Sequence, residues 1–153
     1  MTRKKPYTPK TFESTGINGD VSANVFRSMI ESPAWMDLTG NQKALYITCK
    51  LQLYGVPRKR KPDPDDELTF YMNKHLWADK YHLYDRENGK GFRRDMGALI
   101  SHGFISCVER GEVTRTRNIY KLCSMWRKFG QSDFSVPLQT VTKSLQNQMT
   151  QKK

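Results

Sequence analysis

One predicted helix of this chain carries basic residues on a single face. Apolar residues recur there at intervals of three and four, which predicts an amphipathic helix that buries Phe92, Met96, Leu99 and Ile100. At about 100° per residue, the opposite face carries Lys90, Arg94, Gly97 and Ser101, with Arg93 on its flank. Arginine can form two hydrogen bonds to one guanine, so we expect Arg93 or Arg94 to contact base edges of DNA.

Two features of this helix have a second interpretation. The basic face could be merely solvated and paired with Asp95 or Glu87, but it contains no acid except at its edge, which favours contact with DNA. Gly97 lies in the middle of the helix, where glycine costs about 1 kcal/mol relative to alanine. Either a sugar-phosphate backbone approaches closely at Gly97 or a neighbouring element packs there, and the sequence favours neither explanation.

Two β-rich runs follow the helix, which is expected to end at Gly103, and they flank a loop around Gly111. The predicted hairpin is basic and carries Arg110, Arg115, Thr116, Arg117 and Lys121. Such a loop can insert arginine into a narrow minor groove or hold phosphates, whereas the alternative is a soluble turn without a ligand. Lys74, at the start of the preceding predicted helix, completes the expected DNA-contacting set.

The composition favours a polyanionic partner. Lysine and arginine outnumber aspartate and glutamate by 26 to 15, for a net charge of +11, which favours nucleic acid first and an anionic membrane surface second. No apolar stretch approaches the roughly 20 residues needed to span a bilayer, and the first residues lack the apolar core of a signal peptide. We therefore expect a cytoplasmic protein, associated with the nucleoid or a plasmid.

The three cysteines, Cys49, Cys107 and Cys123, lack metal-ligand spacing and indicate reduced thiols. In the predicted hairpin, Cys107 lies opposite Tyr120 and Cys123 opposite Phe104, so a disulfide across the hairpin is not expected.

An abrupt change of composition over residues 56–67 predicts an exposed loop with two opposed charge blocks. Its basic block is a candidate for phosphate contacts, although a solvated charge run is the favoured interpretation: Arg58, Lys59, Arg60 and Lys61. The acids that follow suggest a Mg²⁺ nuclease only weakly, because a flexible loop does not fix an octahedron of ligands. No phosphate loop, nucleophile elbow or zinc spacing occurs in the chain. We expect no metal, no cofactor and no enzymatic activity.

The order of predicted elements defines the expected fold. A short amphipathic helix on Val25, Phe26, Met29 and Ile30 leads to the N-cap Ser32 with Pro33 and the core anchor Trp35. Thr39 and Gln42 have capping-box spacing and open a long helix. A short strand over 68–72, a helix over 74–80, the basic helix and the hairpin follow. We expect an α+β fold of the winged helix-turn-helix type, with a three-helix core, a small antiparallel sheet and a wing hairpin.

The domain limits follow from composition. We expect a flexible basic arm over residues 1–19, one DNA-binding domain over 20–130, and a polar tail over 131–153 that is disordered or a marginal helix. The tail carries an apolar stripe that is a candidate dimer contact: Leu138, Val141, Leu145 and Met149. We expect a monomer that dimerises or multimerises on repeated DNA sites.

Two sequence segments resemble known proteins. The run Glu31-Ser-Pro-Ala-Trp-Met-Asp-Leu38 and the run His102-Gly-Phe-Ile-Ser-Cys-Val-Glu-Arg110 resemble small bacterial winged-helix proteins of plasmids, prophages and conjugative elements. The resemblance covers about residues 28–123 and implies a winged-helix fold that binds double-stranded DNA. The chain departs from the pattern in its long turn over 81–89 and in the charged loop before Leu68.

The sequence therefore predicts a protein that binds duplex DNA with sequence preference, at an operator, a replication origin or a transfer origin of a mobile element. Two alternatives stay open. One is an RNA-binding or ribosome-associated basic protein, although the strand aromatics that RNA modules use have apolar neighbours here. The other is a protein-interaction adaptor with the same fold.

Overall fold

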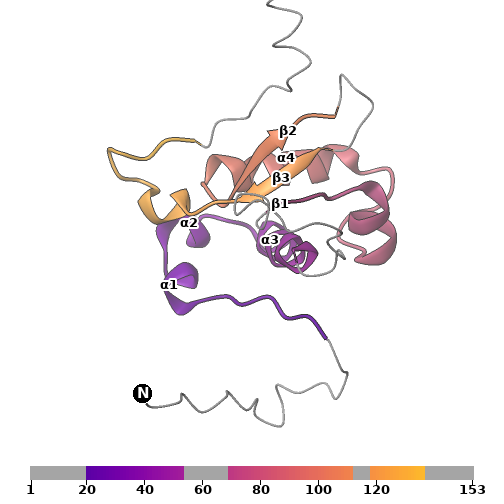
Figure 1. The fold of residues 1–153 in the computed structure, drawn as a ribbon, viewed down its shortest axis with the longest axis horizontal. Coiled ribbons are helices and arrows are strands. Elements are labelled where there is room, and N and C mark those ends of the chain that lie inside the picture. Colours follow the sequence, from indigo (N-terminus) through magenta and orange to yellow (C-terminus); the bar gives the residue numbers. More distant parts are fainter. Residues whose placement is uncertain (1–19, 54–68, 112–117, 137–153) are drawn as a thin grey trace, which may run out of the picture.

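A computed structural model describes residues 20–53, 69–111 and 118–136 of the 153-residue chain. Its helices and strands follow one another as shown in Figure 1: α1 (Arg27–Ile30), α2 (Pro33–Met36), α3 (Gly40–Gln52), β1 (Thr69–Phe70), the π-helix η3 (His75–Lys80), α4 (Gly89–Ser101), β2 (Ile105–Glu109), β3 (Ile119–Leu122) and the 3₁₀-helix η4 (Met125–Lys128). The expected long helix, basic helix and hairpin arms are all present.

The three strands form one antiparallel sheet in the order β1-β3-β2. Cys107 lies opposite Tyr120, as the sequence predicts, and Phe70 lies opposite Tyr120 on the other side. The register shifts between Cys107 and Glu109, so β2 carries an extra residue there. Helices combined with this small antiparallel sheet make the fold α+β, as expected.

Local capping explains where two of the helices begin. The Ser32 hydroxyl accepts a hydrogen bond from the Trp35 amide at 3.2 Å, and Pro33 fills the first helical position. At α3, the Thr39 hydroxyl accepts from the Gln42 amide, and the Gln42 side chain accepts from the Thr39 amide at 2.9 Å. This is the predicted capping box, and it fixes the Gln42 side chain beside the N-terminus of α3.

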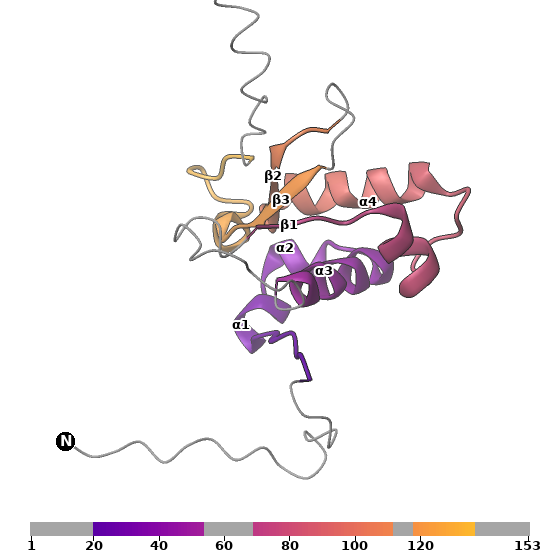
Figure 2. The same cartoon turned by 45° about the vertical axis from the view of Figure 1, so that its right-hand side comes forward.

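Two aromatic clusters hold the elements together. In the first, Phe104 contacts Trp35, Tyr46 and Trp126 with ring centroids 5.0–5.9 Å apart, which joins α2 and α3 to the start of β2 and to η4. In the second, the Trp77 ring of η3 stacks on Phe92 of α4 at 5.0 Å. Figure 2 shows α4 running alongside α3, the helix on which it packs.

Three details differ from, or sharpen, the expectation. The N-cap residue Phe26 and Ile30 of α1 remain 63% and 47% exposed, and only Met29 of that helix is buried. Of the predicted strand over 68–72, Leu68 lies outside the described residues, and Thr69 and Phe70 are the described residues of that range that pair with β3. All three cysteines are free, and the Cys123 thiol donates to the Gly103 carbonyl at 2.9 Å.

The end of α4 is fixed by Gly103. Its φ of +80° is left-handed, and the amides of Gly103 and Phe104 donate to the carbonyls of Ile100 and Leu99 in a Schellman motif. A β-carbon at Gly103 would lie 2.6 Å from the Trp126 nitrogen, so η4 packs against this turn too closely for a side chain. The His102 ring lies 2.7 Å from the Asp37 carboxylate, which ties the same turn to the end of α2.

Gly103→Ala should destabilise the fold more than Gly130→Ala. Both glycines have φ near +80°, where a β-carbon costs roughly 1–2 kcal/mol, but only Gly103 adds the collision with η4. Urea unfolding of the two variants measures the difference. Equal losses of stability would contradict the close packing of η4 on the Gly103 turn.

Candidate nucleic-acid interface

The two faces of α4 differ as the sequence predicts. The apolar residues of one face are buried in the core: Phe92, Met96, Leu99 and Ile100. The opposite face is exposed and carries the basic and small residues Lys90, Arg93, Arg94, Gly97 and Ser101. The helix opens with Asn88, whose side chain accepts a hydrogen bond from the Gly91 amide at 3.0 Å. A β-carbon at Gly91 would lie 2.7 Å from that side chain, so a larger residue there would displace the Asn88 cap.

Gly97 faces open space. A β-carbon built on it meets no atom of the described residues within 4 Å, so none of the described elements packs against this position. Packing against a described helix or strand therefore does not account for glycine here. Close approach of a sugar-phosphate backbone to Gly97 stays a prediction.

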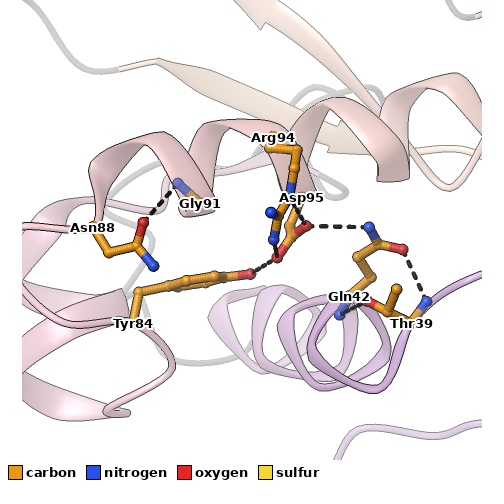
Figure 3. A network of polar contacts seen from close by, with 7 residues as sticks. All are labelled: Thr39, Gln42, Tyr84, Asn88, Gly91, Arg94 and Asp95. Carbon is orange, nitrogen blue, oxygen red and sulfur yellow. Dashed lines mark hydrogen bonds and ion pairs between the residues drawn. The ribbon is translucent and has the colours of Figure 1, made fainter.

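A buried carboxylate lies beneath the other edge of this face (Figure 3). Asp95 is 0% exposed and accepts hydrogen bonds from three side chains. Tyr84 Oη donates to Oδ2 at 2.7 Å, and Gln42 Nε2 donates to Oδ1 at 3.1 Å. Arg94 Nε donates to Oδ1 at 3.0 Å, with Nη2 at 3.4 Å from Oδ2. The network joins α3, the segment after η3, and α4.

The hydrogen bonds of this network stabilise the charged form of Asp95 and of Arg94. Burial alone would raise the pKa of Asp95, but the hydrogen bonds from Arg94, Tyr84 and Gln42 outweigh it and hold that pKa below its ordinary value. Burial and the hydrogen bond to Asp95 raise the pKa of Tyr84, so the phenol stays protonated and donates. The hydrogen bond to Asp95 also raises the pKa of Arg94. Asp95 is therefore an ionised carboxylate inside the protein.

Arg94 is consequently held in place while it faces solvent. Its side chain is 73% exposed, yet two of its nitrogens are committed to Asp95. Its Nη1 group makes no hydrogen bond to another described residue, so that end is available to a ligand. The pairing with Asp95 was one alternative that the sequence offered, and the structure combines it with exposure of the guanidinium.

Sequence reasoning missed the burial of Asp95, which it placed at the edge of the basic face. A signal was present in the spacing. Asp95 lies three residues after Phe92 and four before Leu99, which puts it on the apolar side of the helix. A carboxylate on that side must find donors, and Tyr84 and Gln42 were not identifiable as those donors before the fold was known.

A groove lies between α4 and the base of the β2–β3 hairpin. It has a volume of about 270 Å³, and its floor is formed by the buried side chains Phe92, Met96, Ile100, Cys107 and Tyr120. Its rim carries Arg93 and Gly97 from the helix, and Arg110 and Asn118 from the hairpin. The groove thus adjoins the exposed basic face on the side away from Asp95.

Asn118 closes the base of the hairpin. Its Oδ1 accepts from the Gly111 amide at 2.7 Å, and its Nδ2 donates to Tyr120 Oη at 3.2 Å. The bond to Gly111 joins the two arms, and the bond to Tyr120 fixes the Asn118 side chain on its own arm. Arg110 is exposed immediately beyond the register shift in β2, where an extra residue bends a strand.

The remaining predicted contacts are spread over the chain. Lys74 is exposed at the start of η3, and Lys121 is half-buried within β3. The other predicted contacts lie outside the described residues: Arg58, Lys59, Arg60, Lys61, Arg115, Thr116 and Arg117. The arm over 1–19 and the apolar stripe of the tail also lie outside them.

No protein-family model, no curated protein and no solved structure matches the chain. Among the described helices, none has the length and apolar character needed to cross a bilayer. The described segments bring no three histidine, cysteine, aspartate or glutamate side chains together as a metal site would require.

Asp95→Asn should destabilise the protein at neutral pH and do so less in acid. The folded-state pKa of Asp95 is lowered, so the carboxylate's contribution is complete above its unfolded value of about 3.9 and is lost as pH falls through the lower folded value. We expect Asp95→Asn to lower the free energy of unfolding by about 1–3 kcal/mol at pH 7 and by less below about pH 4. Urea unfolding from pH 3 to pH 7 measures this.

Asp85→Asn is the matched control, because Asp85 is exposed and precedes the same helix. It should change stability little at any pH. An Asp95→Asn protein as stable as wild type at pH 7 would contradict the role of the buried carboxylate.

Proposed function

We propose that this chain binds duplex DNA with sequence preference through a winged-helix domain. In this proposal α4 is the recognition helix and the β2–β3 hairpin is the wing. The observation that carries it is the division of α4: one face belongs to the core, and the other is basic, exposed and continuous with the groove at the hairpin. The net charge of +11 supports a polyanionic ligand.

The geometry of Arg94 supports base reading. A flexible arginine loses conformational entropy when it is fixed on a base, whereas Asp95 already holds the Arg94 guanidinium from one side. A guanidinium fixed on a helix face can present its remaining donors to a guanine in the major groove. Lys90 and Ser101 lie on the same exposed face and are suited to phosphate contacts.

The strand aromatics weigh against an RNA module. Such modules stack splayed bases on exposed aromatic side chains of a sheet. Here Phe70, Phe104 and Tyr120 are buried, and Phe70 packs on Tyr120 with ring centroids 5.7 Å apart. A protein-interaction adaptor remains the other alternative, and it would not need basic residues on α4 and at the groove.

The biological setting is part of the proposal. We infer a role at an operator, a replication origin or a transfer origin of a mobile element, from the resemblance of residues 31–38 and 102–110. One such domain covers a single half-site, so we expect a monomer that assembles on repeated sites.

Binding of duplex DNA should depend steeply on salt. If the protein neutralises about six phosphates, its affinity falls roughly a thousandfold between about 50 and about 200 mM salt. Fluorescence anisotropy with duplex DNA, single-stranded DNA and duplex RNA of the same sequence measures this and ranks the ligands. Affinity for duplex DNA that stays constant over this range, or is no higher than for RNA, would contradict the proposal.

Arg94 and Lys90 should contribute differently to specificity. Sites selected from a randomised duplex pool should lose preference at one base position in Arg94→Ala, with a loss of about tenfold or more on the preferred site. Lys90→Ala, a matched change one helical turn away, should weaken all sequences alike. If Arg94→Ala also weakens every sequence equally, α4 does not read bases through Arg94.

A further inference from the structure

The groove beside α4 has two chemically distinct parts. Its floor is apolar, and the side chains that form it are buried: Phe92, Met96, Ile100, Cys107 and Tyr120. Its rim is cationic, with Arg93 on one side and Arg110 on the other. None of the described residues that line it is acidic. An apolar floor under two cations suits a ligand with a carbon skeleton and an anionic group.

Two features keep the groove open. Gly97 contributes no side chain, and space for a β-carbon is present there. On the facing side, β2 carries an extra residue, and the Asn118 side chain accepts from the Gly111 amide across the hairpin and donates to Tyr120 Oη on its own arm. The hairpin side of the groove is therefore held by hydrogen bonds within the protein.

Gly97 has an energetic cost that the fold alone does not explain. Alanine at this mid-helix position would stabilise the helix by about 1 kcal/mol, and the structure has room for it. Gly97 lies on the rim of the groove together with Arg93, so the methyl group of an alanine there would occupy the rim. A ligand backbone that enters the groove at this point would account for glycine.

We propose that the groove binds one sugar-phosphate unit of a DNA strand, with its deoxyribose on the apolar floor and its phosphate shared by Arg93 and Arg110. The proposal rests on duplex DNA binding as proposed above and specifies where one strand lies. Lys90 is exposed on the outward face and does not line the groove, so it contacts a different phosphate.

Salt dependence tests the shared phosphate without knowledge of the target sequence. Each phosphate neutralised contributes about 0.9 to the slope of log affinity against log salt. With a random 20-base-pair duplex, Arg93→Ala combined with Arg110→Ala should reduce the slope by about 0.9, because both arginines neutralise one phosphate. The control is the double variant Arg93→Ala with Lys90→Ala, in which Arg110 still neutralises the shared phosphate. Its slope of log affinity against log salt should therefore equal that of the single variant Lys90→Ala.

Gly97→Ala tests the close approach, because it changes volume and no charge. We expect a higher melting temperature, an affinity for the same duplex reduced by about tenfold, and an unchanged salt slope. Gly40→Ala is the matched control. Gly40 is also a helical glycine with room for a β-carbon, but it lies on α3 and does not line the groove. It should leave the affinity unchanged.

Three outcomes separate this inference from the proposed function. If wild-type protein binds duplex DNA without a salt slope, the proposed function itself fails. If it binds with a steep slope, but the Arg93 and Arg110 changes lower the slope by about 1.8 together, the arginines contact separate phosphates and the shared site is wrong. If Gly97→Ala binds as tightly as wild type, no strand enters the groove at Gly97.

Discussion

The structure depends on one buried carboxylate. Asp95 is fully buried, and it is satisfied by a tyrosine, a glutamine and an arginine from three parts of the chain. Gln42 is shared between two tasks, since its oxygen completes the capping box of α3 and its nitrogen holds Asp95. The start of α3, the packing of α4 and the orientation of Arg94 are therefore coupled. Removing one donor from a buried charge disturbs more than one pair of residues.

The same helix must serve the core and the surface. Phe92 stacks on Trp77 while the adjacent Arg93 reaches the groove, so the core fixes the position of the basic face. The π-helical turn of η3 places Trp77 against Phe92. The carbonyl of Trp77 accepts hydrogen bonds from the amides of Leu83 and Tyr84. The segment that delivers Tyr84 to Asp95 is thus built on the residue that anchors α4. The core therefore supports the exposed basic face of α4 from beneath.

Much of this was predictable from local sequence, because local rules govern it. Ser32 with Pro33, the Thr39–Gln42 box and Gly103 each fix a helix end through contacts within a few residues, and the spacing of Phe92, Met96 and Leu99 fixes the buried face of α4. What could not be predicted depends on distant partners. The donors of Asp95 are up to 53 residues away, and the groove exists only where α4 meets the hairpin. The exposure of Phe26 was also missed, because periodicity shows a face and not what covers it.

In the proposed function, duplex DNA contacts the exposed face of α4 and the base of the β2–β3 hairpin. Titration of ¹⁵N-labelled protein with duplex DNA, followed by amide NMR shifts, locates the contact directly. Binding at this surface should concentrate the amide shifts at the hairpin base around Arg110 and on the exposed face of α4, at Lys90, Arg93, Arg94, Gly97 and Ser101. The amides of Met29 and Met36 should change little. Shifts concentrated on α1 and α2, with the α4 face unchanged, would contradict binding at this surface.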